Sequence, residues 1–414
     1  MAKPSGMAAY IAVTAAYWAF MLSDGALRML VLLHFHTLGF SPVQLAYLFL
    51  LYEVAGIVTN LSAGWLAARF GLSSTLYAGL SLQIIALFAL LQLGPDWGIW
   101  ASVAYVMCVQ GLSGVAKDLS KMSAKSAVKM LAPKDEGGLF RWVAILTGSK
   151  NAVKGFGFFV GAATLGAFGF HAVIQSMAVF LIVILIVLAL RMPKGLPTGR
   201  KDAKFTEVFS KDRNVNWLSL SRVFLFGARD VWFVVGIPIY FYAVLSDGTE
   251  AGNRTAFFLI GSFMAAWIIL YGVVQANAHK ILRAKDRGAK AMIEGAAGWI
   301  WLLLVVPLAL SVFLYLRPDI SDVNTVFVVV GLLVFGAVFA INSSLHSYLI
   351  LEFSTGDRVT MDVGFYYMAN ASGRLIGTLL SGLSYQLGGV AACLFVAAVM
   401  LIVAGLAAGR LKSS

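Results

Sequence analysis

The residues of this 414-residue chain that could do chemistry are charged side chains set inside long apolar stretches. A charge at the centre of a bilayer costs at least about 2.5–3.5 kcal/mol on insertion scales, so each one in a spanning stretch invites a functional explanation. Five cations and three acids occupy such positions: Asp24, Arg28, Glu53, Lys150, Lys154, Arg229, Asp230 and Arg374. A cavity lined by this set has a positive surplus and suits an anionic substrate.

Two groups of these residues predict a binding site for an oxyanion. Lys150 and Lys154 stand one helical turn apart beside Asn151, where two ammonium groups repel each other unless an anion or acid lies between them. Residues 362, 366, 370 and 374 follow at four-residue steps and share one helix face. Arginine matches phosphate or arsenate oxygens two at a time, and lysine acts as a point charge. The predicted substrate contacts are Arg28, Lys150, Asn151, Lys154, Arg229, Tyr366, Asn370 and Arg374.

The three central carboxylates leave two interpretations open. Asp24, Glu53 and Asp230 are candidates for proton coupling, because burial raises a carboxyl pKa, although a neighbouring arginine lowers it. Alternatively, Arg28 with Asp24, and Arg229 with an acid such as Asp230 or Glu53, form ion pairs that only hold helices together. The sequence does not choose between coupling and structure.

Composition defines the class of protein that must position these charges. Of the residues, 60% are hydrophobic and 12% are charged, and the mean hydropathy is +0.86. Soluble domains carry about a quarter charged residues, so this chain is an all-α polytopic membrane protein. Cys108 and Cys393 are isolated, which predicts neither a disulfide framework nor a metal site, and no cofactor is expected. The chain contains no hydrolase or metalloprotease motif, so we do not expect an enzyme.

Apolar runs predict twelve spanning helices in two sets of six. The longest connection is polar and basic, which predicts an N-terminal bundle over 1–190, a cytoplasmic linker over 191–216 and a C-terminal bundle over 217–414. The twelve runs are Tyr10–His36, Pro42–Gly64, Ser73–Leu93, Trp97–Lys117, Arg141–Leu165, His171–Leu190, Trp217–Val244, Thr255–Ala276, Ala291–Leu316, Val323–Leu349, Met361–Leu383 and Val390–Gly409.

The loop charges predict the orientation of these helices. Cations concentrate in the loops on the side of both termini, and positively charged loops stay cytoplasmic, so both termini are expected inside. The net charge of +12 therefore reflects topology, and we expect membrane lipid and no nucleic acid as a partner. The series Lys117, Lys121, Lys125 and Lys129 is predicted to form a solvated inner face or, alternatively, a funnel for the anion, with Lys117 at the membrane edge.

The two halves also share a weak internal sequence repeat. Residues 149–154 with Gly157 align with residues 369–374 with Gly377, and each set places a cation three residues before the glycine. The spacings Gly157/Gly161 and Gly373/Gly377 are typical of helix packing. Six plus six helices with weak internal symmetry indicate the major facilitator fold of two pseudo-symmetric six-helix bundles. In that fold helices 3, 6, 9 and 12 lie outside the cavity.

Several long segments resemble one transporter family. DGALR at 24–28, GVAKDLSKMS at 114–123 and TGSKN at 147–151, with the helices around them, are similar to the ArsJ-type organoarsenical efflux permeases of the major facilitator superfamily. The resemblance implies export of 1-arseno-3-phosphoglycerate and so arsenate resistance. It also implies a functional link to the glyceraldehyde-3-phosphate dehydrogenase that makes this ester, and a place in the bacterial cytoplasmic (inner) membrane.

Other functions remain open at this point. A carrier for another organic anion, such as a phosphorylated metabolite, with or without proton coupling, would need the same cations. An anion channel or an intramembrane enzyme would not require the six-plus-six repeat. The resemblance assigns no substrate contact, so the predicted site rests on the charges alone.

Overall fold

The chain is helical, with no β-strand, throughout the part that a computed structural model describes. The described residues are 4–70, 72–94, 96–131, 138–192, 210–282, 284–319, 321–354 and 359–412. The predicted linker lies largely outside this part of the chain.

The first half supplies six membrane crossings, close to the predicted runs. The second crossing is interrupted, and the fourth continues well past its predicted end at Lys117. The helices are α1 (Pro4–Thr37), α2 (Pro42–Tyr47), α3 (Leu50–Phe70), α4 (Leu72–Leu90), α5 (Ile99–Leu131), α6 (Gly138–Phe168) and α7 (Phe170–Arg191).

The second half repeats this arrangement. Its helices are α8 (Arg213–Phe233), α9 (Gly236–Leu245), α10 (Glu250–Ile281), α11 (Ala284–Leu316), α12 (Asp322–Phe353) and α13 (Val359–Ala408). Helix α13 contains two crossings joined at Gly388 and Gly389, where the backbone leaves helical geometry. Ten described segments are long and apolar enough to cross a bilayer, one of them being this double crossing. With α6 the total is twelve, as predicted.

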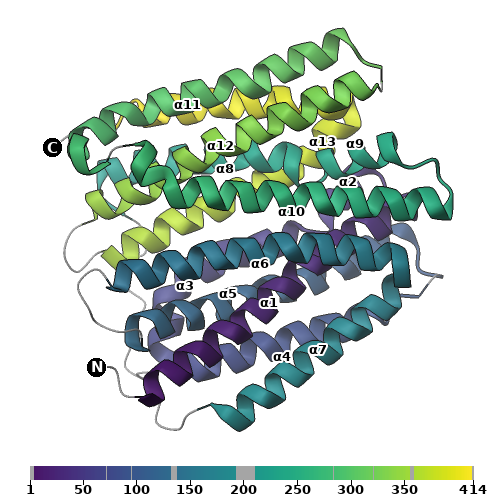
Figure 1. Ribbon diagram of the computed structural model, residues 1–414, viewed down its shortest axis with the longest axis horizontal. Helices are drawn as coiled ribbons and strands as arrows, with labels where there is room; N and C mark the ends of the chain where they lie inside the picture. The colour runs from purple at the N-terminus through teal and green to yellow at the C-terminus, as the bar shows by residue number, and fades with distance from the viewer. Residues whose placement is uncertain are drawn as a thin grey trace.

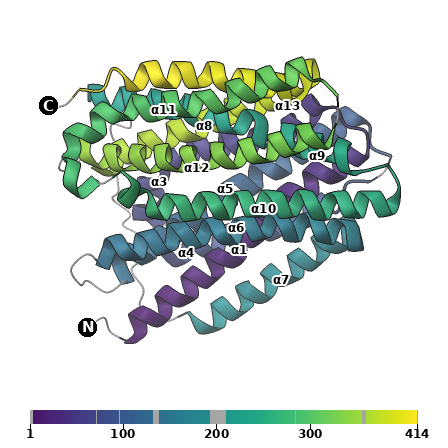
Figure 2. The same ribbon diagram turned by 45° about the horizontal axis from the view of Figure 1, so that its top comes forward.

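The two halves form separate groups of helices that meet along two seams. In Figure 1 the helices of the first half lie below those of the second, and both marked termini lie at the same end. Figure 2, from a second direction, shows α10 of the second half running alongside α6 of the first. Helix α6 packs on α10, and α13 packs on α2 and α3. These two seams are the main contacts between the halves among the described residues.

Glycines with positive φ mark equivalent turns in the two halves. Gly39 follows the first crossing and Gly169 precedes the sixth, while Gly248 and Gly389 occupy the corresponding turns of the second half. A side chain with a Cβ is strained in this region of backbone conformation. The turns thus carry the same internal repeat that the sequence suggests.

Closely packed glycines clamp the first and fifth crossings of each half together. A Cβ added at Gly161 would collide with the backbone of Ala26 on α1, and one at Gly377 would lie 2.6 Å from the carbonyl oxygen of Gly227 on α8. Small residues allow this approach of helix backbones in membranes. The prediction that the paired glycines serve helix packing is therefore confirmed.

The seventh crossing contains a break that the apolar run does not reveal. Between α8 and α9 the backbone N–H groups of Val235 and Gly236 donate to Oγ of Ser381 on α13, at 3.1 and 3.2 Å. Backbone groups in a membrane must find partners inside the protein. The serine supplies that partner, so the break sits one turn beyond Asp230 without an unsatisfied N–H at these two positions.

We expect Gly161→Ala to destabilise the protein by about 1–3 kcal/mol, because overpacking a tight contact costs this much. Gly298→Ala is the matched control, since Gly298 lies in α11 with no atom within 4 Å of an added Cβ. Thermal unfolding in detergent measures both. An equal melting temperature for the two variants would contradict the packing role of Gly161.

Candidate functional site

A cavity of about 280 Å³ lies between the two halves. Its lining residues come from α1, α3, α5 and α6 on one side and from α8, α10, α12 and the first part of α13 on the other, with Val234 beside α8. Among the described residues, none from the third, sixth, ninth or twelfth crossing lines the cavity, as expected for this fold. Small-molecule sites usually measure about 300–1,000 Å³, so the cavity suits a small metabolite.

The cavity lies between the middle of the helices and the end that carries the termini. Its lining runs from Tyr17 to Arg28 on α1 and from Ile268 to Gln275 on α10. Toward the opposite end the halves pack against each other, and there the ring of His36 meets that of Tyr242 edge-on at 4.8 Å. The described structure is therefore sealed at the end away from the termini.

The lining carries a positive surplus. Eight cations face three carboxylates, and Asp24 lies immediately behind Lys154. The cations are Arg28, Lys117, Lys121, Lys150, Lys154, Arg222, Arg229 and Arg374, and the carboxylates are Glu53, Asp118 and Asp230.

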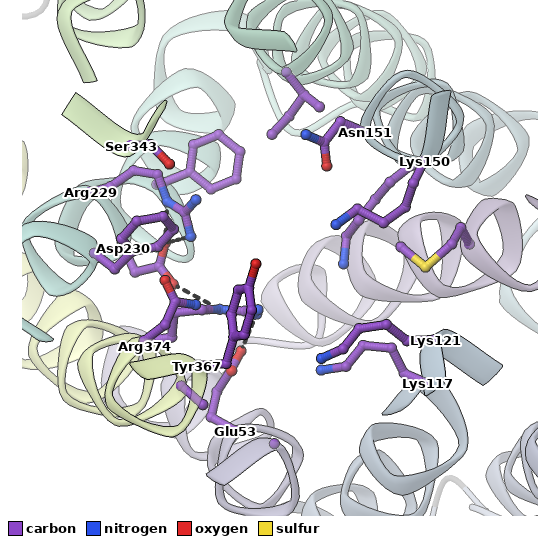
Figure 3. A pocket seen from close by; sticks show the side chains of 18 of the residues that line it. Glu53, Lys117, Lys121, Lys150, Asn151, Arg229, Asp230, Ser343, Tyr367 and Arg374 are labelled. Carbon is purple, nitrogen blue, oxygen red and sulfur yellow. Dashed lines mark hydrogen bonds and ion pairs between the residues drawn. The ribbon is translucent and has the colours of Figure 1, made fainter. Parts of the chain in front are cut away.

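A chain of five charges crosses the cavity and joins the halves (Figure 3). Oε1 of Glu53 accepts from Nη1 of Arg28 at 3.3 Å and from Nη2 of Arg374 at 2.6 Å, the second of these contacts being drawn in Figure 3. Nε of Arg374 lies 3.4 Å from Oδ2 of Asp230, whose Oδ1 accepts from Nε of Arg229 at 2.6 Å. Arg374 thus connects an acid of the first half to an acid of the second.

Asp24 does not pair with Arg28, so that predicted ion pair is wrong. Oδ2 of Asp24 accepts from Nζ of Lys154 at 2.6 Å, and Oδ1 accepts from the hydroxyl of Tyr52 at 2.6 Å. The reason is that the backbones of α1 and α6 approach closely at Gly25. A Cβ added there would lie 2.5 Å from the carbonyl oxygen of Lys154, so the Lys154 side chain starts beside Asp24. Lys154 therefore reaches Asp24, and Arg28 turns to Glu53 instead.

Tyr366 is also misplaced by the sequence prediction. Its side chain is fully buried outside the lining, with the guanidinium of Arg222 4.9 Å from its ring. Each four-residue step turns about 40° around a helix of 3.6 residues per turn. The shared face therefore drifts, and Tyr367 lines the cavity with Asn370 and Arg374.

Lys150 and Asn151, both predicted substrate contacts, lie on the cavity wall of α6 (Figure 3). Nδ2 of Asn151 donates to Oε1 of Gln275 on α10 at 3.5 Å, which links the halves on the terminal side of the central charges. Lys150 is partly buried. The four predicted contacts Arg28, Lys154, Arg229 and Arg374 also line the cavity, each in an ion pair.

Four lining charges are absent from the predicted site. Arg222 stands close to the predicted start of its span at Trp217, but α8 begins earlier, at Arg213, and encloses it. The apolar run predicts Lys117 at the membrane edge, but α5 continues to Leu131, and this residue is only 8% exposed. Asp118 and Lys121 follow on the same helix.

Lys121 and Asp118 form a polar cluster between α3 and α5. Nζ of Lys121 donates to Oδ1 of Asp118 at 2.8 Å and to Oδ1 of Asn60 at 2.7 Å, and the hydroxyl of Thr59 donates to Asp118. The inner lysine series is thus not simply a solvated face: Lys117 and Lys121 line the cavity, while the side chains of Lys125 and Lys129 lie outside the described residues.

The Asp24–Lys154 pair yields a stability test. We expect Asp24→Asn or Lys154→Gln alone to cost about 3–5 kcal/mol, because each strands a buried charge, whereas the double variant removes both charges and recovers most of the loss. Unfolding in detergent measures all three. Additive losses in the double variant would contradict a direct pair.

Sequence and structure comparisons place the chain in a family. The sequence profile described as Major Facilitator Superfamily matches residues 9–353, and no curated protein sequence matches the chain. Solved structures share the fold at low identity. A mutant of the nucleoside transporter NupG has 16% identity and a TM-score of 0.70, with 99% of this chain and 100% of that chain covered. A D-xylose-proton symporter has 12% identity and a TM-score of 0.71, with 98% of each chain covered.

A third structure is a POT family transporter in complex with 5-aminolevulinic acid, at 15% identity and a TM-score of 0.71, covering 95% of this chain and 94% of that one. At these identities the likeness shows the fold alone. The profile covers most of the chain, and the cavity lies between two six-helix halves. The chain therefore belongs to the Major Facilitator Superfamily and is an integral membrane transporter, not an enzyme.

Proposed function

We propose that this transporter exports 1-arseno-3-phosphoglycerate, an anionic pentavalent organoarsenical, from the cytoplasm by alternating access and so confers arsenate resistance. The surplus of cations over carboxylates in the central cavity carries the anionic part of the proposal. The arsenical itself is suggested by the resemblance of the N-terminal helices to ArsJ-type permeases.

The chemistry of the cavity suits such an ester. The cargo has a three-carbon frame with phosphate and arsenate groups, and both groups accept the paired N–H bonds that arginine offers. Neither Cys108 nor Cys393 is among the described lining residues. Arsenic would therefore be held as an oxyanion, by charge and hydrogen bonds, and not by thiolates.

The side on which the cavity lies is compatible with loading from the cytoplasm, as the proposed export requires. The basic loops predict that the terminal side is cytoplasmic, and the cavity lies toward this side. The protein then lies in the bacterial inner membrane, and the structure corresponds to the state that loads cargo from the cytoplasm. Moving an anion out of a negatively charged cytoplasm releases about 2.3 kcal/mol per charge per 100 mV, so the membrane potential can drive export without proton coupling.

Proton-coupled transport is the alternative that the carboxylates support. Glu53, Asp230 and Asp24 are all held by cavity cations. A cargo anion that took Arg374 away from Glu53 would leave this acid unpaired, and a proton could bind at that step.

A carrier for another organic anion is the second candidate. The same arginines and lysines would hold a phosphorylated metabolite such as 3-phosphoglycerate, because phosphate and arsenate present the same oxygen geometry. The fold does not discriminate, since the similar structures are named for transporters of nucleosides and D-xylose. Only transport measurements separate the two cargoes.

Everted membrane vesicles test the cargo and the direction. We expect uptake of labelled arsenate only when glyceraldehyde 3-phosphate, its dehydrogenase and NAD are all present, because only this mixture makes the ester. An imposed pH gradient that leaves uptake unchanged would support export driven by the membrane potential.

Vesicles without the protein and mixtures without the dehydrogenase are the controls. Uptake of bare arsenate would replace the proposal with a simpler oxyanion carrier. Strong uptake of 3-phosphoglycerate without the ester would favour the second candidate.

Two variants test the proposed contacts in the same assay. We expect Lys150→Ala and Arg374→Ala to lower uptake at least about tenfold without loss of membrane insertion, because each removes a cation from the cavity. Lys290→Ala is the control, since this lysine lies on the exposed surface of α11. Normal transport by both cavity variants would refute the anion site.

A further inference from the structure

We propose that Lys117 and Arg222 are the two anion-binding poles of the cavity, one in each half, and that they receive opposite ends of a cargo with two anionic groups. This inference rests on the proposed transport of an organic anion. Neither residue is a contact predicted from the sequence. The inference also specifies a cargo with two separate anionic groups in preference to a single oxyanion.

Lys117 is a buried ammonium group without a polar partner among the described residues. Its side chain lines the cavity, and Nζ lies 4.0 Å from the ring centre of Tyr52. It makes no hydrogen bond or ion pair in the described part of the chain, whereas its neighbour Lys121 binds Asp118 and Asn60. The aromatic ring attracts the ammonium group, but it offers no oxygen or nitrogen acceptor to the three N–H donors. A buried charge in this state favours an acceptor brought by the cargo.

Arg222 is the counterpart in the second half, and neutral groups position it. Nε donates to Oδ1 of Asn370 at 3.0 Å, and Nη1 donates to the carbonyl oxygen and the hydroxyl of Ser343 at 3.2 and 3.4 Å. The rings of Phe226 and Tyr366 lie 3.8 and 4.9 Å from the guanidinium carbon. These contacts fix the plane of the guanidinium.

The charge of Arg222 stays uncompensated in this setting. No carboxylate of a described residue forms an ion pair with it, and its Nη2 donates to no described acceptor. The side chain is only 4% exposed, yet it lines the cavity. A preorganised, desolvated guanidinium with a free edge is the group that binds an oxyanion most strongly.

Five other cations of the cavity differ from these two, because each of them forms an ion pair with a carboxylate. Arg28, Arg374 and Arg229 share the carboxylates Glu53 and Asp230. Lys154 is paired with Asp24, and Lys121 with Asp118. The cargo would have to break an ion pair to use any of these cations, whereas Lys117 and Arg222 need no such exchange.

The two poles face the same space from opposite halves. Lys117 projects from α5 on one wall, and the opposite wall carries Ser343, the residue that holds Arg222 (Figure 3). A molecule with one anionic group satisfies one pole. A molecule with two groups on a short frame engages both halves at once, and the second contact forms within the complex at a high effective concentration.

Binding of phosphonates to the purified protein in detergent tests this assignment. We expect one member of a series of alkane bisphosphonates with one to five carbons to bind at least tenfold more tightly than methylphosphonate. Lys117→Gln and Arg222→Gln should each remove this advantage, and the double variant should lose little more. Lys290→Gln is the control and should bind as the unaltered protein does. Isothermal titration calorimetry measures each Kd.

Equal affinity for methylphosphonate and all bisphosphonates would overturn the proposal, and so would a folded Lys117→Gln or Arg222→Gln variant with unchanged affinity. If these variants do not fold, Lys117→Arg keeps the charge on a longer side chain. It should move the preferred bisphosphonate to a shorter spacer, and an unchanged preference would refute the role of Lys117. Bisphosphonate binding without uptake of the organoarsenical would refute the proposed cargo and leave the two poles intact.

Discussion

The contact between Glu53 and Arg374 is the interaction on which the arrangement of the halves depends. The acid belongs to the first half and the guanidinium to the second, and the pair lies in a membrane interior where neither charge could remain alone. Arg28, Asp230 and Arg229 extend the pair into a chain that spans the cavity. The chain holds the two walls at a fixed spacing, and any change of conformation has to exchange these partners for others.

The surrounding helices make that exchange a movement of whole halves. Within each half the first and fifth crossings approach at glycines until a single added methyl group would collide with the neighbouring backbone. Between the halves the seams of α6 with α10, and of α13 with α2 and α3, contain larger side chains such as Phe159 and Phe258, whose rings meet edge-on. Glycine contacts also occur at these seams, where a Cβ on Gly382 of α13 would collide with the carbonyl oxygen of Pro42 on α2.

The sequence predicts the spans well because a bilayer demands long apolar runs, and it predicts which crossings line the cavity because charges are costly elsewhere. Pairing between helices is different. That Asp24 meets Lys154 depends on how closely α1 approaches α6, which no spacing within one helix reveals. The edges of the apolar runs place Arg222 and Lys117 near the ends of their spans, but α8 and α5 extend past those edges and bring both side chains to the cavity. The drift of the face of α13 likewise exchanged Tyr366 for Tyr367.

The interrupted seventh crossing separates two tasks along one chain segment. Asp230 and Arg229 belong to α8, whereas Tyr242, which meets His36 at the sealed end, belongs to α9. Because Oγ of Ser381 accepts from both N–H groups at the break, the start of α9 is fixed to α13 by hydrogen bonds inside the protein. One serine hydroxyl therefore secures the junction of the two tasks, and its loss would leave two backbone N–H groups unsatisfied there.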